Sequence, residues 1–180
     1  MPDLSTATWA VLGAVAEGPT HGFAVSQLLS ADGPLGQVWT VPRPMVYREL
    51  DKLIQLDLVA EGALERTAQG PARTIVEATL AGRAAVTDWL GRPVQHVRDV
   101  RSALLLKLVL IERAGGDPES LLTAQRERFE PQLAGLEQTR DRAEGFDRTL
   151  AQWRVANSLA TVEFIDAALA DARSALRDDT

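Results

Sequence analysis

Five cationic side chains in the first half of the chain have the spacing of a surface that binds a phosphate-rich polyanion. Arg43, Arg48 and Lys52 lie in one short stretch, and Arg66 and Arg73 lie near the two ends of a polar segment that follows it. A guanidinium group pairs two N–H donors with phosphate oxygens or a guanine edge, and an ammonium group binds phosphate as a point charge. Arg48 and Lys52 are four residues apart, so a helix would place both on one face. A solvated helix face carries the same residue types, and the elements around it decide between the two interpretations.

Residues that could carry catalysis or hold a metal ion are few. The chain has no cysteine and only two histidines, His21 and His96, and neither has the spacing of a metal ligand. It contains no Gly-rich phosphate loop and no Gly-x-Ser-x-Gly sequence. We therefore expect no enzyme, no metal site and no cofactor. His21 precedes Gly22 at a predicted helix start. It is interpreted either as a helix cap or phosphate contact, or as a structural turn residue.

An amphipathic helix is predicted where the first three cations lie. Apolar side chains recur there at the spacing of one helix face, at Val46, Leu50, Leu53 and Ile54. Pro44 suits the first helical position, and a residue before a proline disfavours the α conformation, so the helix should begin near 43–44. Arg48 and Lys52 then lie on the face opposite the apolar stripe. The start of the helix carries Arg43, Met45 and Tyr47.

A β-hairpin is predicted directly after this helix. Residues 58–64 and 74–78 are short segments with partial alternation, as in strands. The polar segment between them contains Gly and Pro and is typical of a hairpin tip. Arg66 and Arg73 would reach phosphates from this tip.

Two helices before this segment and one after it complete the pattern. Residues 6–17 form the first helix and the second begins at a Thr20 cap, so the amphipathic helix that starts near 43–44 is the third. Thr79 caps the helix after the hairpin, over 80–90. This order of elements is the layout of a winged helix-turn-helix over residues 1–92. Such a domain places its third helix against the DNA major groove and its hairpin, the wing, beside the DNA backbone.

A particular set of glycine, aromatic and leucine positions accompanies this layout. It comprises Leu12-Gly13, Glu17-Gly18-Pro19, His21-Gly22-Phe23, Trp39, Tyr47, Leu50, Leu53, Gly70, Arg73, Thr79 and Gly82. In these positions residues 8–90 resemble PadR-type transcriptional regulators. The resemblance implies DNA binding. Thr20 and His21, at the start of the second helix, are also predicted to bind DNA. The resemblance also implies a homodimer made by an all-helical C-terminal domain, and a response to phenolic or drug-like molecules.

The chain departs from that family at the start of the third helix. The family has a sequence like Ser-Pro-Gly-Thr-Leu-Tyr there, whereas this chain has Pro42-Arg43-Pro44-Met45-Val46-Tyr47. The net charge is −6, and residues 1–92 hold seven Arg and Lys against ten Asp and Glu, a balance of −3. A DNA-binding domain is usually basic. We therefore expect modest, salt-sensitive binding with weak non-specific affinity. The alternative is a protein-interaction module, with a winged helix and a coiled-coil arm, whose DNA-binding face has degenerated.

The second half is predicted to be all-helical. Gly91-Arg92-Pro93 reads as a linker, and a helix over 97–114 is apolar nearly all round in its middle. Asp117-Pro118 starts another helix, which breaks around residues 144–147. The last helix repeats apolar residues every seven positions, as in a coiled coil, at Val155, Val162, Leu169 and Leu176.

This seam predicts a dimerisation domain over residues 93–180. We expect the seam to pack on a partner chain, with Trp9 and Leu12 of the first helix at the same interface. Packing of the seam within one chain is the alternative.

Four of the nine aromatic residues are tryptophans. Indole rings make flat walls for planar ligands, although they are more often core or interface anchors. Trp9 and Trp153 are the candidate walls of an effector site for a small planar aromatic molecule. Trp39 and Trp89 are expected in the winged-helix core.

Together these patterns predict a mainly α protein, with an N-terminal winged helix-turn-helix that has a two-stranded wing and an all-helical C-terminal dimerisation domain. The expected function is a ligand-responsive repressor that binds a pseudo-palindromic operator in double-stranded DNA as a homodimer. The chain has no apolar run of 18 residues and no start resembling a signal peptide, so we expect a cytoplasmic protein without a membrane segment. A small-molecule carrier is a third, weaker hypothesis.

Overall fold

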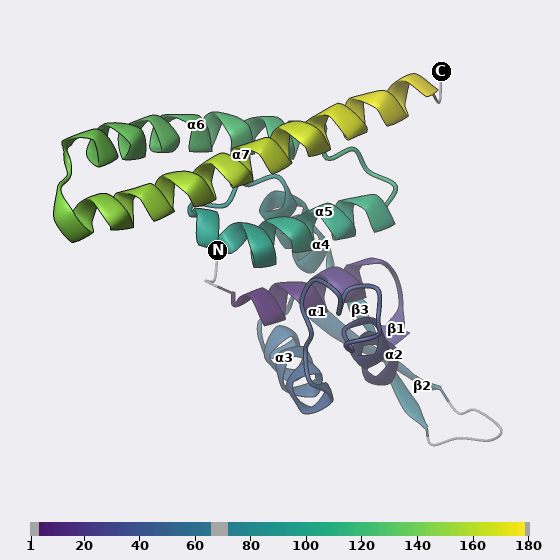
Figure 1. The fold of residues 1–180 in the computed structure, drawn as a ribbon. Helices are drawn as coiled ribbons and strands as arrows, with labels where there is room; N and C mark the ends of the chain where they lie inside the picture. The colour runs from purple at the N-terminus through teal and green to yellow at the C-terminus, as the bar shows by residue number, and fades with distance from the viewer. Residues whose placement is uncertain (1–3, 66–71, 179–180) are drawn as a thin grey trace. The chain divides into compact units, whose positions relative to one another are not determined.

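The chain folds into α-helices and one small antiparallel sheet (Figure 1). The computed structural model describes residues 4–65 and 72–178, with side chains described as far as residue 174. In chain order the elements are α1 (Thr6–Ala16), β1 (Thr20–His21), α2 (Gly22–Leu28), α3 (Arg43–Gln55), β2 (Val59–Glu65), β3 (Arg73–Ala78), α4 (Leu80–Leu90), a 3₁₀ turn (Val97–Asp99), a π-helical turn (Val100–Leu104), α5 (Leu105–Arg113), α6 (Glu119–Arg142) and α7 (Gly145–Asp178). The predicted fold class, a winged helix followed by a helical C-terminal part, is confirmed.

The chain divides into two compact units. The winged unit comprises residues 1–90 and 105–114, and the hairpin unit comprises residues 91–104 and 115–180. By its contacts α5 therefore belongs with the winged unit, although the sequence-based division after residue 92 assigns it to the second domain.

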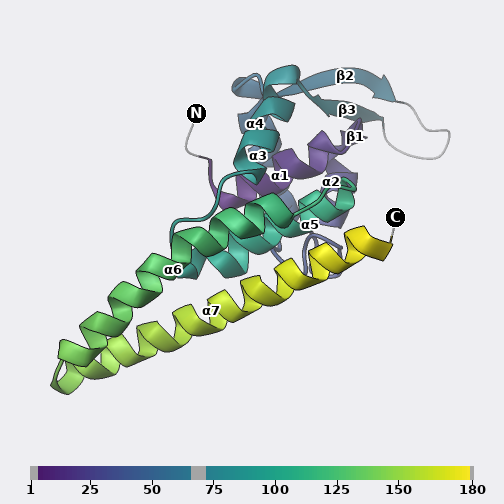
Figure 2. The same cartoon turned by 90° about the horizontal axis from the view of Figure 1, so that it is seen from above.

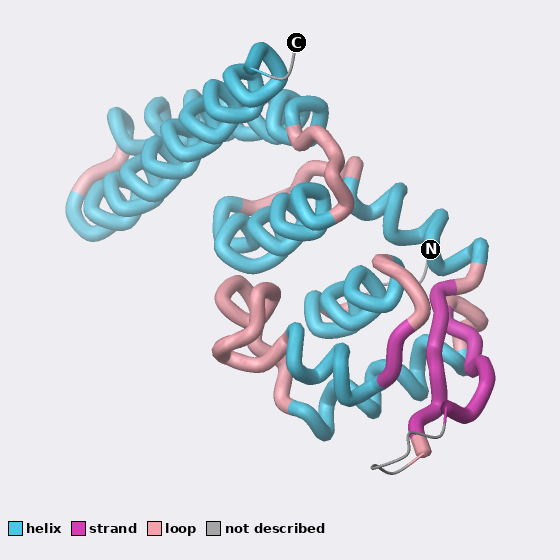
Figure 3. Tube along the Cα trace, turned by 90° about the vertical axis from the view of Figure 1, so that its right-hand side faces the viewer, coloured by secondary structure: helices cyan, strands magenta, loops and turns pink. Residues whose placement is uncertain are grey.

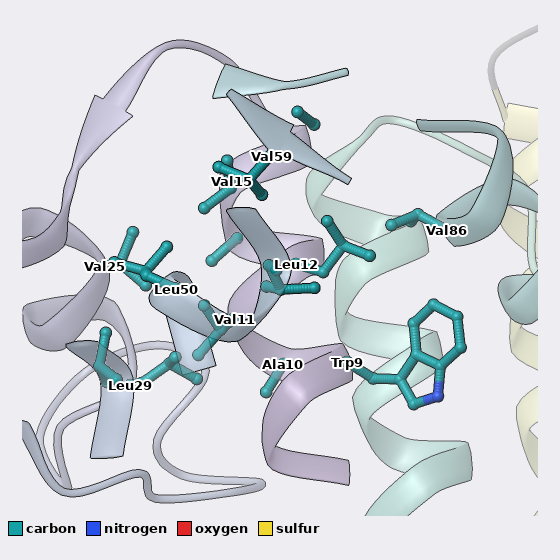
Figure 4. Packing of buried hydrophobic residues seen from close by; sticks show 14 of the residues in the cluster. Trp9, Ala10, Val11, Leu12, Val15, Val25, Leu29, Leu50, Val59 and Val86 are labelled. Atoms are coloured by element: carbon teal, nitrogen blue, oxygen red, sulfur yellow. The ribbon is translucent and has the colours of Figure 1, made fainter. Parts of the chain in front are cut away.

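α1 is the central helix of the winged unit. The Ser5 hydroxyl caps it by accepting a hydrogen bond from the Thr8 N–H at 3.2 Å. Every residue from Thr8 to Val15 is buried, because α2, α3, α4, α5 and β3 all contact this helix. Figure 4 shows Val11 and Leu12 in the middle of the apolar side chains that these elements contribute. A helix that is apolar on all sides is buried on all sides.

The second helix begins later than the sequence predicted. Thr20 does not cap it: Thr20 and His21 are extended and form β1, in which Thr20 lies opposite Val76. His21 is the N-cap of α2, and its Nδ1 accepts a hydrogen bond from the Ala24 N–H at 3.0 Å. The Thr20 cap was therefore wrong, because pairing with β3 holds that residue in the sheet.

α3 begins where the prolines predicted. It starts at Arg43 after Pro42, which has no side-chain oxygen for a cap, and its buried face carries Val46, Glu49, Leu50 and Leu53. The segment before it, residues 29–42, packs on the same core through Leu29, Leu35 and Val41. Backbone hydrogen bonds fix this segment, among them one from the Val41 N–H to the Leu29 carbonyl at 2.9 Å.

The wing is the hairpin of β2 and β3. Their antiparallel register pairs Val59 with Ala78 and Glu65 with Arg73, with one irregularity between Glu61 and Leu64. β1 pairs with the other edge of β3, so the strand order is β1-β3-β2 (Figure 3, magenta). The two-stranded wing is confirmed, and β1 adds a short third strand that alternation over two residues could not predict.

Close contacts join the last two helices of the winged unit to the core. The Thr79 hydroxyl caps α4 by accepting from the Gly82 N–H at 3.0 Å, as predicted. α5 contacts α1, and the Arg113 guanidinium donates to both carboxylate oxygens of Glu17 at 2.6 Å. This hydrogen-bonded carboxylate raises the pKa of Arg113, although partial burial opposes the shift.

The hairpin unit is built on α6 and α7, which run side by side (Figures 1 and 2). Two cross-helix ion pairs join them, Arg126 to Asp166 and Arg173 to Glu119, each at 2.6 Å. The buried Gln125 amide accepts from the Val94 N–H at 2.7 Å and donates to the Val94 carbonyl at 3.0 Å.

The helical path predicted over residues 97–114 is present but not uniform. Its first part takes 3₁₀ and π geometry, and α-helix begins only at Leu105. Within residues 4–65 and 72–178, no helix is both long and apolar enough to cross a membrane.

Candidate nucleic-acid interface

A groove of about 480 Å³ lies in the winged unit between the start of α2, one side of α3 and the sheet. Its walls combine cations, aromatic rings and two carboxylates. The residues that line it are His21, Gly22, Phe23, Arg43, Tyr47, Leu50, Asp51, Ile54, Glu61, Ala72, Arg73, Thr74 and Val76.

Two guanidinium groups are held against one aromatic ring in this groove. The Arg43 guanidinium lies 5.1 Å from the centre of the Phe23 ring, and that of Arg73 lies 5.7 Å from it. Arg43 is also 5.9 Å from the ring centre of Tyr47. These are cation–π distances, and such contacts position a cation without neutralising its charge. Both guanidinium groups therefore keep their charge for an incoming anion.

The register of the sheet brings His21 to Arg73. His21 lies opposite Ile75 in the β1–β3 pair, and Arg73 is two residues before Ile75 on the same strand. Diagonal neighbours of this kind are within reach of long side chains. The Nη1 atom of Arg73 lies 3.0 Å from Nε2 of His21. Two residues 52 positions apart in the sequence thus meet at the edge of the groove.

Gly22 allows Tyr47 to form one wall of the groove. A Cβ atom at position 22 would lie 2.6 Å from Cε1 of the Tyr47 ring, which is shorter than any normal contact. Tyr47 is 40% exposed, so its ring covers the backbone of α2 while the other side stays open. Any larger residue at position 22 would displace this ring.

The outer face of α3 carries mixed charges. Arg48 and Lys52 are exposed, and Asp51 is exposed between them. The Arg48 guanidinium lies 3.4 Å from the carboxylate of Glu49, whose side chain is buried against α1. With 70% of its side chain exposed, Arg48 still projects into solvent.

The structure gathers four of the nine predicted DNA-binding residues at the groove: His21, Arg43, Tyr47 and Arg73. Arg48 and Lys52 are exposed on α3 but do not line it. Met45 is half-buried and packs against the apolar core, and Thr20 lies in β1. Arg66 lies outside the described residues.

The aromatic and acidic side chains of the groove that were not among the predicted site residues are Phe23, Asp51 and Glu61. Phe23 was part of the family-like His-Gly-Phe pattern, and that pattern was the only indication of its place.

The two residues of α1 that were predicted at a dimer interface lie inside the winged unit. Leu12 is fully buried, and Trp9 is 7% exposed. The Trp9 ring stacks on Trp89, with ring centres 4.9 Å apart and planes at 10°. The ammonium group of Lys107 lies 4.7 Å from the centre of the Trp89 ring. Trp9 and Trp89 thus form a stacked pair in the core of this unit.

The predicted seam on α7 largely packs within the hairpin unit. Val155 and Leu169 are 1% and 6% exposed, and Val162 is half-buried, on a helix that runs beside α6. The side chain of Leu176 lies outside the described residues. Trp153, the second candidate wall of an effector site, is 63% exposed.

The part of the chain that the structure describes contains no cluster of three or more His, Asp or Glu side chains that could hold a metal ion.

No protein-family model matches the chain, and no curated protein matches it. Solved structures do match. The chain is similar to Bacillus subtilis PadR in complex with operator DNA, with 20% identity and a TM-score of 0.46 over 90% of this chain and 97% of that one. It is similar to Bacillus subtilis PadR in complex with p-coumaric acid, with 19% identity and a TM-score of 0.42 over 96% and 98% of the two chains. It is also similar to a PadR-like transcriptional regulator from Bacillus cereus, with 18% identity and a TM-score of 0.39 over 93% and 98%.

Proposed function

We propose that this chain is a DNA-binding transcriptional regulator that acts as a homodimer. The observation that carries the proposal is the pair of guanidinium groups, Arg43 and Arg73, held on Phe23 in a groove beside α3 of a winged helix-turn-helix. This fold presents its third helix to the major groove and its wing to the backbone. Cations between that helix and the wing would therefore lie beside phosphates of the DNA backbone.

The proposal divides the contacts between two surfaces. Arg48 and Lys52, exposed on α3, face base edges in the major groove. The groove residues face the backbone, with Thr20 beside them; they are Arg43, Arg73, His21 and Tyr47. Phosphate contacts fix the position of the protein, and base contacts supply the specificity.

The acidity of the chain sets the expected strength of binding. A net charge of −6 repels DNA at a distance, so non-specific affinity should be weak and should fall steeply with salt. Affinity should come from the few cations at the interface, and two copies in a dimer double their number.

An exposed apolar stripe on α7 supports the homodimer. Phe146, Trp153 and Phe164 are 77%, 63% and 37% exposed. At 3.6 residues per turn, spacings of seven and eleven residues return to nearly the same side of a helix. This side lies away from the seam of Val155 and Leu169, which is already buried. A second copy would cover the stripe, and a two-fold dimer reads two half-sites about 34 Å apart in a pseudo-palindromic operator.

Control by a small planar aromatic effector is the third part of the proposal. The exposed indole of Trp153 offers a flat wall for such a molecule, whereas one face of Trp9 is already covered by Trp89. Repression is the mode of action that the resemblance of residues 8–90 favours. An effector that binds one arrangement of the dimer better than the other would release the operator.

The test measures binding of the full-length protein to the region upstream of its own gene by fluorescence anisotropy, at low and at physiological salt. Arg48→Ala should lower specific affinity by about 1–3 kcal/mol and leave non-specific binding nearly unchanged. Arg73→Ala should weaken both, and should reduce the slope of log affinity against log salt by about 0.9. Arg98→Ala is the control, since Arg98 is an exposed arginine of the hairpin unit. If the parent protein binds no DNA even at low salt, the proposal fails.

One observation favours a protein-interaction module instead. Asp51 is exposed on α3 between Arg48 and Lys52, and a carboxylate on this face repels phosphates. In that case the parent protein would show no DNA binding, and neither would the Arg48→Ala and Arg73→Ala variants. The same surface would then bind a protein partner.

A further inference from the structure

His21 makes two contacts that a neutral imidazole cannot satisfy together. Its Nδ1 accepts the Ala24 N–H at 3.0 Å, and its Nε2 lies 3.0 Å from Nη1 of Arg73. A neutral imidazole has one acceptor nitrogen and one N–H donor, and a guanidinium group has donors only. If Nδ1 accepts, Nε2 carries the hydrogen and faces another donor. One of the two contacts is therefore left without an acceptor.

The cap of α2 fixes which contact is satisfied. The Ala24 N–H belongs to the first turn of the helix and is fixed in place by the backbone, so it depends on the Nδ1 acceptor. The Arg73 side chain is half-buried and stacks on Phe23, and it can turn about its own bonds. The cap therefore holds His21 as the Nε2–H tautomer. Nε2–H and the Arg73 guanidinium then present their donors to the same point.

No carboxylate in the described part of the chain occupies that point. Asp51 and Glu61 line the same groove, yet among the described residues neither forms an ion pair with Arg43 or Arg73. The groove is open to solvent, and Arg43 brings a second cation to its wall through Phe23. Two donors, a nearby cation and an open approach are what an external anionic oxygen needs.

We propose that His21 and Arg73 clamp one phosphate oxygen, with Nε2–H and the guanidinium donating to it together. Resting on the proposed function, the phosphate is one of the DNA backbone, held where β1 meets the wing. His21 acts in this clamp as a neutral donor, and Arg73 supplies the charge. The bound oxygen resolves the conflict between the two donors, so the free chain is already arranged for it.

Two substitutions at position 21 separate the clamp from the cap. His21→Asn keeps an N-cap oxygen for Ala24 but cannot reach the position of Nε2. His21→Gln loses the cap but keeps an N–H donor at about the reach of Nε2. In full-length protein, His21→Asn should lower DNA affinity about tenfold with unchanged thermal stability. His21→Gln should lower stability and retain more of the affinity.

The salt dependence distinguishes the two members of the clamp. A neutral donor displaces no counterion, so His21→Asn should leave the slope of log affinity against log salt unchanged. Arg73→Gln should reduce that slope by about 0.9, because one phosphate is no longer neutralised. A parent-like affinity for His21→Asn would overturn the clamp, even if DNA binding itself were established.

Nitrogen-15 NMR on the imidazoles, at about pH 8, tests the tautomer directly. His96 is the other histidine and is exposed, so it serves as an internal reference. Nε2–H should be the His21 tautomer, and titration with inorganic phosphate should shift Nε2 of His21 but not of His96, with the shift lost in Arg73→Gln. An Nδ1–H tautomer, or no shift with either phosphate or DNA, would refute the proposal. A shift with phosphate in a protein that binds no DNA would keep the clamp, assign it to a phosphorylated small molecule, and remove the proposed function.

Discussion

A buried hydrogen bond between Thr8 and Glu49 joins α1 to α3. The Thr8 hydroxyl donates to the Glu49 carboxylate at 2.8 Å, and the two residues are 0% and 6% exposed. The Arg48 guanidinium reaches the other oxygen of Glu49 at 3.4 Å. A buried carboxylate needs donors, because it has given up its hydration. This contact therefore holds the helix that carries Arg48 against the core of the winged unit.

Removal of the Thr8 hydroxyl should destabilise the protein. Thr8→Val keeps the shape of the side chain but leaves a buried oxygen of Glu49 without its donor, so the free energy of unfolding should fall by about 1–3 kcal/mol. Replacing both partners, as in Thr8→Val with Glu49→Met, should cost less than the sum of the single changes. Urea unfolding followed by circular dichroism measures all four proteins. Additive losses would show that the two side chains do not stabilise each other.

At the scale of single residues, the sequence indicated the cations that line the groove better than it indicated their surroundings. Arg43, Tyr47 and Arg73 were predicted to bind DNA, and the structure places all three at the groove, where contact with DNA stays a prediction. Phe23 contacts both guanidinium groups, and the only sequence feature that marks it is the His-Gly-Phe pattern, which does not predict these contacts. Glu49 reads as a surface residue of an amphipathic helix, and only its contact with Thr8 explains its burial.

α5 packs closely on α1 at Gly13, which has no side chain. A Cβ atom at Gly13 would lie 2.5 Å from Cδ1 of Leu110, which is 4% exposed. The two helices can approach this closely because position 13 has no side chain. Glycine in the middle of a helix costs about 1 kcal/mol relative to alanine, and the packing of Leu110 offsets this cost.

Gly13→Ala tests the approach of the two helices. The added methyl group should displace Leu110 and lower the free energy of unfolding by about 1–3 kcal/mol, in spite of the better helix propensity of alanine. Leu110→Ala alone should cost about 2–5 kcal/mol, and the double variant should lose less than the two single changes combined. Guanidinium unfolding gives these values. A Gly13→Ala protein more stable than the parent would mean that the helices do not meet at this position.

Elements were predicted well where a local pattern is long enough. The turn residues and the apolar spacing placed the start of α3, and both ends of β2, β3 and α4, within about two residues of the observed positions. β1 is two residues long and forms only by pairing with β3, so no local periodicity in the sequence predicts it. The π-helical turn of residues 100–104 could likewise not be predicted, since its apolar pattern is that of an α-helix.

At the scale of the whole molecule, α5 shows why the division into units was harder to predict than the elements. The apolar run of residues 104–111 has to be buried on more than one side, and the sequence indicates that much. The element that buries this run is decided by the shape of the partner surface, here by the lack of a side chain at Gly13. The periodicity of the sequence does not predict that choice. The same holds for the seam on α7, because a seven-residue repeat fits packing on α6 of the same chain as well as packing on a second copy.

Assembly can be separated from folding because α7 has two apolar sides. Leu169→Asp places a charge on the buried side, so it should unfold the hairpin unit, with a loss of helical circular dichroism. Trp153→Ser with Phe164→Ser changes only the exposed side, so helicity should stay at the parent level while a dimer becomes a monomer in sedimentation velocity at micromolar concentration. Leu64→Ser is the control, since Leu64 is an exposed apolar residue of β2, at 56%, outside the hairpin unit. A double serine variant that still sediments as a dimer would exclude this stripe as the interface. A parent protein that is itself a monomer would exclude the homodimer, and with it the reading of two half-sites at once.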